Sequence, residues 1–208
     1  MGPDDWLLAY FGFLNANKGG ETLVRALAEL VRGGRPARLL MVGGQVGSSD
    51  PTNLAYLEHV ENLIRELGVA DRVQWTGFTG AAEVSANLLA ADCAVLPYRE
   101  GASLRHGSLM AVLAHWLPIV TTETPPRQRR GTSPAERAVQ EVFPALRDGE
   151  NARLVPPEDP EGMASAVAEV MGDPALRARL ASGALDLARD FEWGAIARRH
   201  LLAYDQFN

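Results

Sequence analysis

The sequence has one cysteine, a shortage of positive charge and no long hydrophobic run, and each shortage excludes a class of protein. Cys93 cannot form an internal disulfide, so nothing marks an oxidising compartment. Twenty lysines and arginines face 26 acidic residues, a net charge of −6. This balance argues against a nucleic-acid binder, because phosphate backbones require clustered positive charge. No stretch of about 18 apolar residues could span a membrane, and the first residues lack a secretory signal. We therefore expect a soluble, cytoplasmic protein.

Motifs for metal binding, nucleophilic catalysis and dinucleotide binding are also missing. The chain has four histidines, His59, His106, His115 and His200. They are widely separated and do not show the spacing of zinc ligands, so we expect no metal site. Ser103 and Ser108 do not lie in a G-x-S-x-G nucleophile turn. The segment "GGQVG" at 43–47 lacks the G-x-G-x-x-G spacing and follows the second predicted strand, so hydride transfer is not favoured.

What the sequence does contain is a short apolar run followed by an amphipathic segment, repeated along the chain. Six runs are predicted as strands, at residues 6–14, 37–44, 72–78, 93–98, 118–122 and 152–157. They are rich in Leu and Val and alternate little, which is typical of parallel strands buried on both faces. The sequence therefore predicts a single α/β domain over residues 1–208. We expect a Rossmann-like, doubly wound parallel sheet of about six strands, with helices on both faces and a C-terminal helical run.

The segments between the strands have helical spacing. The predicted buried faces are formed by Leu23, Leu27, Leu30 and Val31 in 19–32, by Leu54, Leu57, Glu61 and Ile64 in 52–67, and by Leu109, Val112, Leu113 and Trp116. Asp-Pro pairs at 50–51, 159–160 and 173–174 predict helix starts, because aspartate accepts from the first free amides and proline fits the first helical position.

The segment 122–140, "TETPPRQRRGTSPAERAVQ", contains four arginines among prolines and is predicted as a long solvated loop. The alternative is a basic patch that faces an anionic lipid or an acceptor. That alternative would give the full protein a peripheral contact with a membrane.

Polar or glycine-rich sequence follows three of the predicted strands. The segments are "GFLNANKGGET" (12–22), "GGQVGSSD" (43–50) and "YREGASLRHGS" (98–108). In an open parallel sheet, the carboxyl ends of the strands lie at one edge, and ligands bind there. We therefore expect the three segments to converge on one ligand site.

The segment 98–108 has the features of an anion-binding turn. Gly101 allows close approach of the backbone, so the amides of 101–104 are predicted to point at an anion near the start of the next helix. Lys18 and Arg105 are the predicted counter-ions of a diphosphate. Glu100 would repel a diphosphate and is predicted instead to accept hydrogen bonds from sugar hydroxyls. Each motif alone is more often a plain turn, so the inference depends on their convergence.

Six segments, in order and spacing, resemble the C-terminal half of the family 4 glycosyltransferases, retaining enzymes of the GT-B architecture also called group 1. These segments are "GFLNANKGGETLVRAL", "LLMVGG", "RVQWTGF", "ADCAVLPYREGAS", "LPIVTT" and "DGENARLVPPEDPEGMASAV". The resemblance covers nearly the whole chain. It implies a domain that binds a nucleotide sugar linked to UDP, GDP or ADP, without a cofactor or metal. It also implies an N-terminal acceptor domain that these 208 residues do not contain.

The resemblance assigns roles to individual residues. Lys18 matches the family lysine at the diphosphate, and Glu100 matches the first glutamate of the E-x7-E motif at the donor sugar; these two are the predicted catalytic residues. The segment 77–79 matches the edge where the base lies. The full set of predicted donor-binding residues is Gly12, Lys18, Thr79, Glu100, Gly101, Ala102, Ser103, Leu104, Arg105 and Ser108.

Two residues depart from the family pattern. Ser108 stands where the second glutamate holds the ribose hydroxyls, and Phe13 stands where an arginine follows the first-strand glycine. Arg105 is the predicted compensation. The sequence predicts the donor-binding domain of an enzyme that transfers a sugar to an acceptor hydroxyl, and alone this domain should bind without turnover. The alternative is a non-catalytic module with a decayed donor pocket. A sugar-nucleotide epimerase would need an acid/base pair, which the sequence does not supply.

Overall fold

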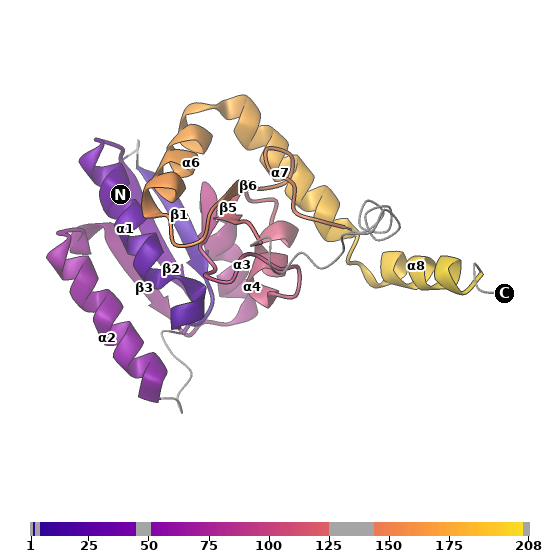
Figure 1. The fold of residues 1–208 in the computed structure, drawn as a ribbon, viewed down its shortest axis with the longest axis horizontal. Coiled ribbons are helices and arrows are strands. Elements are labelled where there is room, and N and C mark those ends of the chain that lie inside the picture. The colour runs from indigo at the N-terminus through magenta and orange to yellow at the C-terminus, as the bar shows by residue number, and fades with distance from the viewer. Residues whose placement is uncertain (1, 3–4, 45–50, 125–143, 206–208) are drawn as a thin grey trace.

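Six short apolar segments form one parallel sheet in the computed structural model, which describes residues 2, 5–44, 51–124 and 144–205. The strands are β1 (Trp6–Phe11), β2 (Ala37–Val42), β3 (Val73–Gly77), β4 (Cys93–Leu96), β5 (Ile119–Thr122) and β6 (Arg153–Val155). Their order is β3-β2-β1-β4-β5-β6, and every pair of neighbours is parallel (Figure 1). All six predicted strands are confirmed. Strand β1 ends before the predicted residue 14, because Gly12 leaves the extended conformation with φ 134°.

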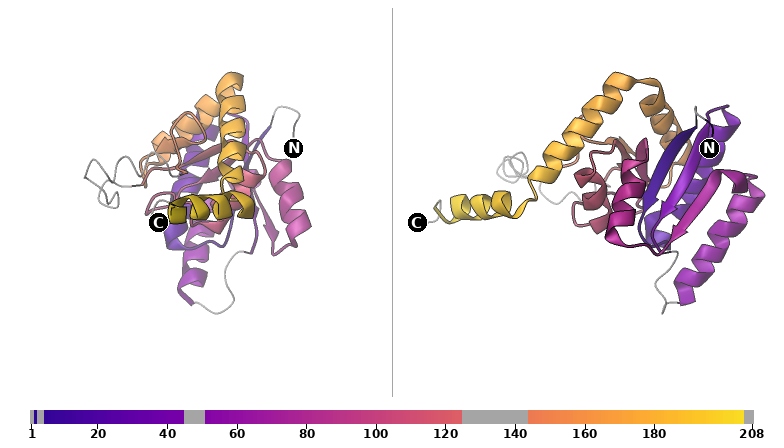
Figure 2. Two further views of the ribbon diagram at one scale, coloured as in Figure 1. Left: turned by 90° about the vertical axis from the view of Figure 1, so that its right-hand side faces the viewer. Right: turned by 180° about the vertical axis from the view of Figure 1, so that it is seen from behind.

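Helices cover both faces of the sheet (Figures 1 and 2). They are α1 (Gly20–Arg32), α2 (Pro51–Glu66), α3 (Ala81–Leu89), α4 (Gly107–Ala114), α6 (Pro160–Gly172), α7 (Pro174–Arg189) and α8 (Trp193–Asp205), with the 3-10 turns η1 (Ala16–Lys18) and η2 (Ala70–Arg72). Helix α1 packs between α2 and α6, whereas α4 packs against α7. Helix α8 extends away from the sheet (Figure 1). The predicted doubly wound α/β fold is therefore confirmed.

The core lies between the sheet and these helices. Leu23, Leu27 and Leu30 of α1 are buried as predicted. The predictions for two other side chains are wrong. Leu54 is exposed on α2, and Trp116 lies beyond the end of α4. Trp116 has φ 56° and turns the chain toward β5, which leaves its side chain 60% exposed.

Helices begin at all three predicted Asp-Pro pairs, since α2, α6 and α7 start at Pro51, Pro160 and Pro174. The Asp159 carboxylate accepts a hydrogen bond from the Gly162 amide at the start of α6. The Asp173 carboxylate accepts from the amides of Ala175 and Leu176 at the start of α7. Asp50 itself lies outside the described residues, as does most of the predicted loop at 122–140, so the Asp50 cap and the loop remain predictions.

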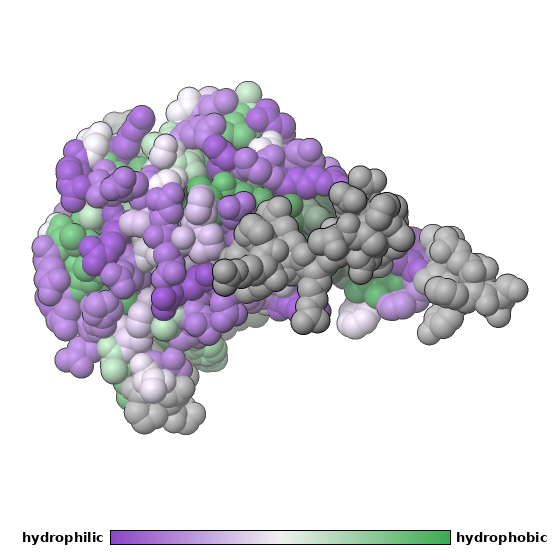
Figure 3. All heavy atoms as spheres, viewed as in Figure 1, coloured by the Kyte–Doolittle hydropathy of each residue, from purple (hydrophilic) through white to green (hydrophobic). Residues whose placement is uncertain are grey.

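The surface seen in Figure 3 is predominantly hydrophilic, with hydrophobic areas scattered among polar ones. Within the described ranges, none of the helices combines the length and the apolar character needed to cross a bilayer. The order of the sheet reverses between β1 and β4. At such a switch point, the loops that follow the two strands diverge and leave room for a ligand.

Candidate functional site

The loops that follow β1 and β4 are in direct contact. The Arg99 amide donates a hydrogen bond of 3.0 Å to the carbonyl oxygen of Asn17. Gly19, with φ 70°, lies so close to Pro97 that a Cβ at residue 19 would come within 1.9 Å of the Pro97 carbonyl oxygen. Only glycine fits this left-handed, close approach. The turn that carries Lys18 therefore lies on segment 97–99, and the predicted meeting of the two loops is confirmed.

Tyr98 is the centre of this contact. Its side chain is buried, and the Lys18 ammonium lies 4.6 Å from the centroid of its ring. The His106 ring is stacked on the Tyr98 ring, with 4.0 Å between centroids. The Tyr98 hydroxyl forms a hydrogen bond of 2.8 Å with Ser108 Oγ. Tyr98 thus contacts Lys18, His106 and Ser108 with one side chain. The sequence patterns had not indicated a role for Tyr98. A sequence signal that could have indicated this role is the aromatic residue at the end of the predicted strand 93–98, next to the switch point.

Burial decides the electrostatics of Lys18 and His106. Removal from water lowers the pKa of the Lys18 ammonium below its usual value. The same cause lowers the pKa of His106, reinforced by the charge of Lys18 and opposed by that of Glu100. Burial also raises the pKa of Tyr98 to about 12, so its hydroxyl stays protonated. The site therefore presents a partly desolvated cation beside a neutral imidazole.

Lys18 has no acidic partner among the described residues, and its ammonium lies over the face of the Tyr98 ring. Glu100 is exposed and likewise forms no ion pair with the described part of the chain. Its charge nevertheless acts on His106, so its carboxylate belongs to the same surface. Lys18 is also the only lysine in the sequence, a feature of the composition that already distinguishes this residue.

The backbone of 101–104 differs from its prediction. The Gly101 amide donates to the Tyr98 carbonyl oxygen, and the Ala102 amide donates to that of Thr122. The expectation of four free amides is wrong for three of the four residues. Gly101 and Ala102 are buried, and buried amides need partners. The Ser103 amide donates to His106 Nδ1 at 3.3 Å. Only the Leu104 amide of this set has no partner within the described chain.

The remaining predicted site residues surround this centre to different degrees. Gly12 lies next to the start of α4, since a Cβ at residue 12 would be 3.6 Å from Ser108 Cβ. Thr79 follows β3, and its hydroxyl is buried without a hydrogen-bond partner, as is Asn15 Oδ1 after β1. Arg105 is exposed, and no contact in the described chain joins its guanidinium to Lys18 or Tyr98. Its proposed compensation for Phe13 stays a prediction.

Phe13, at the position where the resemblance predicts arginine, lies against the neighbouring loop. Its ring is 52% exposed and stands over Gly44, where a Cβ would come within 2.9 Å of the ring. At this point the carboxyl edge therefore carries an exposed aromatic ring in place of the arginine that the resemblance predicts.

A pocket of about 360 Å³ is lined by Gly19 and Glu21 at the start of α1 and by Arg99 and Glu158 in the loops after β4 and β6. Within this lining, Arg99 Nε and Nη2 contact Glu158 Oε1 at 2.8 and 2.6 Å. Glu158 has φ 59°, a left-handed conformation that costs a non-glycine residue about 1–2 kcal/mol. A half-exposed ion pair stabilises the folded protein by about 1 kcal/mol or less, so this pair alone does not offset the backbone strain at Glu158.

Together these residues provide a cation, a carboxylate, hydroxyls and one free amide at the carboxyl edge of the sheet. This combination suits a ligand with an anionic part and a hydroxylated part. Among the described residues, no group of three or more His, Cys, Asp or Glu side chains is arranged to hold a metal ion.

Comparison with known proteins defines the family. The sequence model of the family described as "Glycosyl transferases group 1" matches residues 6–173. The chain belongs to this family. It is 31% identical to the D-inositol 3-phosphate glycosyltransferase of Corynebacterium diphtheriae over 196 residues, which are 93% of this chain and 40% of that protein. It is 32% identical to the enzyme of the same name from Stackebrandtia nassauensis, covering 97% of this chain and 42% of that one. The chain thus spans about two fifths of the curated relatives that it matches.

Solved structures share the fold. Sucrose-phosphate synthase from Thermosynechococcus elongatus superposes with a TM-score of 0.72 at 26% identity, covering 100% of this chain and 46% of that one. HepE from Anabaena, in complex with UDP, gives 0.75 at 18% identity, covering 98% and 49%. The C-terminal domain of a group 1 glycosyl transferase from Francisella tularensis gives 0.68 at 16% identity, covering 89% and 85%. The resemblance to the C-terminal half of GT-B glycosyltransferases is therefore confirmed.

Proposed function

We propose that this chain is the donor-binding part of a retaining glycosyltransferase, which moves a sugar from a nucleoside diphosphate to an acceptor hydroxyl. The observation that carries the proposal is Lys18, a half-buried ammonium without an acidic partner in the described chain, at the switch point between β1 and β4. The anion proposed for this cation is the diphosphate of a nucleotide sugar. Structures of HepE with UDP and with UDP-glucose support testing uridine donors first.

The proposed chemistry is positioning and electrostatic stabilisation without a metal. The Lys18 ammonium stabilises the charge that develops on the departing diphosphate, aided by the Leu104 amide near the start of α4. Glu100, whose charge acts on His106 in the same site, accepts hydrogen bonds from the donor sugar and fixes its orientation. Gly12 and Thr79 border the base, and the Ser108 hydroxyl, which is bonded to the buried Tyr98, lies on the ribose side.

The acceptor site and the second half of the catalytic cleft belong to a partner domain. The curated relatives are more than twice as long as the part matched here, which supports a further domain in the whole protein. Because catalysis in this architecture uses both domains, the 208-residue chain is expected to bind donor without transferring the sugar.

A non-catalytic module is the second candidate. It is favoured by the Ser108 hydroxyl, which is bonded to Tyr98 rather than free, and by the closed amides of Gly101 and Ala102. In this case the fold would serve protein contacts, and the nucleotide pocket would have no ligand.

Calorimetric titration of the protein with UDP-glucose, GDP-mannose and ADP-glucose distinguishes the two candidates. We expect saturable binding of at least one donor, and weaker binding of the same donor by the Lys18→Ala variant. Arg32→Ala at the opposite end of α1 is the matched control, because it removes a cation that already pairs with Glu29. Absence of binding at millimolar concentration for all three donors would favour the non-catalytic module.

A further inference from the structure

The loops after β4 and β6 are joined by the Arg99–Glu158 ion pair, although the two residues lie 59 positions apart in the sequence. Arg99 makes contacts in two directions. Its amide donates to the Asn17 carbonyl oxygen in the turn after β1, and its guanidinium contacts the Glu158 carboxylate after β6. One residue therefore connects three loops at the carboxyl edge, and the residue that follows it is Glu100.

Stability does not account for this pair. Both side chains are about half exposed, at 47% for Arg99 and 59% for Glu158, where ion pairs contribute little to folding. Glu158 also occupies a left-handed conformation that glycine would adopt without strain. Backbone strain of this kind, when it persists, is concentrated at functional sites.

We infer that the Arg99–Glu158 pair is a positioning device that holds the backbone of Glu100 at the donor sugar. The inference rests on the proposed function and adds two residues to it. The backbone on the far side of Glu100 is already fixed, because Gly101 and Ala102 donate to Tyr98 and Thr122. On the near side, the guanidinium of Arg99 is the side-chain restraint. Without Glu158, the segment 99–100 keeps only the Arg99 amide bond.

The Glu158→Gly variant separates positioning from folding. It removes the carboxylate and relieves the strained φ, so the melting temperature should stay the same or rise. Binding of the donor that titrates most tightly, among UDP-glucose, GDP-mannose and ADP-glucose, should weaken by about fivefold. Binding of the matching nucleoside diphosphate, which lacks the sugar, should not change. Asp186→Asn, which breaks the remote Arg189–Asp186 pair on α7, is the control and should alter neither affinity.

A double-variant cycle tests whether the pair acts through Glu100. In the Glu100→Ala background, Glu158→Gly should weaken donor binding no further, because the group being positioned is gone. The charge-reversed double variant, Arg99→Glu with Glu158→Arg, should recover part of the affinity that either single change loses.

The outcomes separate this inference from the proposed function. If the unaltered protein binds none of the three donors, both are wrong. If it binds a donor and Glu100→Ala weakens that binding, but Glu158→Gly has no effect or acts additively with Glu100→Ala, the positioning role alone is overturned. Equal losses for the donor and the nucleoside diphosphate, with a lower melting temperature, would assign the pair to folding instead.

Discussion

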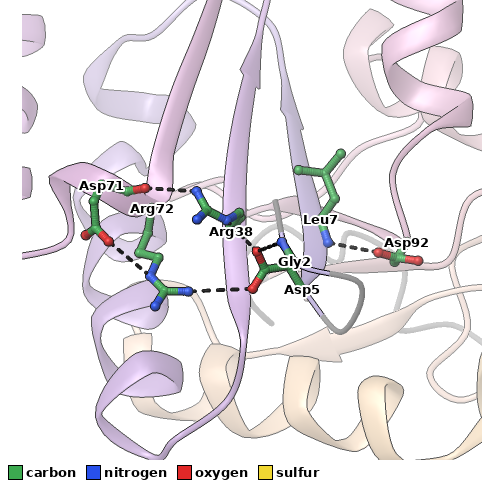
Figure 4. A network of polar contacts seen from close by, with 7 residues as sticks. All are labelled: Gly2, Asp5, Leu7, Arg38, Asp71, Arg72 and Asp92. Carbon is green, nitrogen blue, oxygen red and sulfur yellow. Dashed lines mark hydrogen bonds and ion pairs between the residues drawn. The ribbon is translucent and has the colours of Figure 1, made fainter.

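The charged groups at the amino edge of the sheet differ from Lys18 and Glu100 at the carboxyl edge in whether they are paired. At the amino edge, the charged groups are paired with one another (Figure 4). Asp5 contacts Arg38 at 2.7 Å and Arg72 at 3.7 Å, and Arg38 also donates to the carbonyl oxygen of Asp71. The hydrogen bond from Arg38 lowers the pKa of Asp5, with a further contribution from the Gly2 amide. At the carboxyl edge, Lys18 and Glu100 lie close to one site, and neither forms an ion pair with the described chain.

This difference indicates which charged residues stabilise the folded protein and which are available to bind a ligand. The amino-edge groups restrain the starts of β1, β2 and β3, and their charges are satisfied in the folded protein. The cation at the carboxyl edge is partly removed from water without compensation by a carboxylate, which is unfavourable until an anion arrives. Substitutions at the two edges should therefore separate into effects on stability and effects on binding.

The largest expected effect is that of Lys18→Ala on donor binding. Loss of a charged contact with a diphosphate should weaken the affinity by about 30-fold. The melting temperature should barely change, since the ammonium gains little from its burial beside Tyr98. Calorimetry and thermal unfolding on the same samples provide both quantities. A large loss of stability with unchanged donor affinity would show that Lys18, like the amino-edge residues, serves folding and does not bind the donor.

Glu100→Ala should weaken binding of the nucleotide sugar by about tenfold, because hydrogen bonds between a carboxylate and sugar hydroxyls are charge-assisted. The affinity for the nucleoside diphosphate should stay the same or rise slightly, since a repelling charge is removed. Parallel titrations with the two ligands measure the difference. Equal weakening of both would contradict a contact between Glu100 and the sugar.

Arg38→Ala is the complementary change at the amino edge. It removes the hydrogen bonds to Asp5 and Asp71 and should lower the melting temperature by about 2–4 °C. Donor affinity should not change, because these residues lie at the opposite edge from the site. Thermal unfolding followed by circular dichroism, together with one donor titration, checks both parts. A loss of donor affinity would break the separation of the two edges.

The smallest effect concerns pH and His106. Its pKa in the folded protein is lowered below the ordinary 6.5, so the unfolded chain takes up a proton first as the pH falls. The stability associated with the neutral imidazole is thus present at neutral pH and is lost as the pH drops below 6.5 through the folded pKa. A bound diphosphate favours the protonated ring, so donor affinity should rise by about twofold over the same range.

In the His106→Asn variant, the pH dependence of stability and the pH dependence of donor affinity should both be reduced. Unfolding and titration at several pH values below neutrality measure them. An unchanged pH profile in this variant would exclude His106 as their origin.

The sequence predicts the sheet well because the information is local. Each strand is a short apolar run, and the caps at Asp159 and Asp173 depend on residues two or three positions away. The meeting of the Lys18 turn with segment 97–99 also followed, because parallel strands end at one edge. Local sequence patterns therefore predict the strands and the approximate location of the site.

The details of the site depend on contacts between distant residues, which local patterns do not contain. The Ala102 amide is closed by Thr122, 20 positions on, so the predicted row of donors is incomplete. Tyr98 brings Lys18 and His106 together through ring contacts that no spacing rule describes. The Arg99–Glu158 pair joins two loops, and the backbone of Glu158 has a left-handed conformation in this pair. The sequence alone does not reveal that conformation.

Protection of Lys18 from an amine-reactive reagent tests the central claim most directly. Because Lys18 is the only lysine, mass spectrometry reports its modification without interference from other lysine side chains, and the α-amino group serves as an internal control. The account predicts that saturating nucleotide sugar or nucleoside diphosphate slows the labelling of Lys18 strongly and leaves that of the α-amino group unchanged. If Lys18 is labelled at the same rate with and without saturating, calorimetrically verified donor, the diphosphate does not bind at this cation.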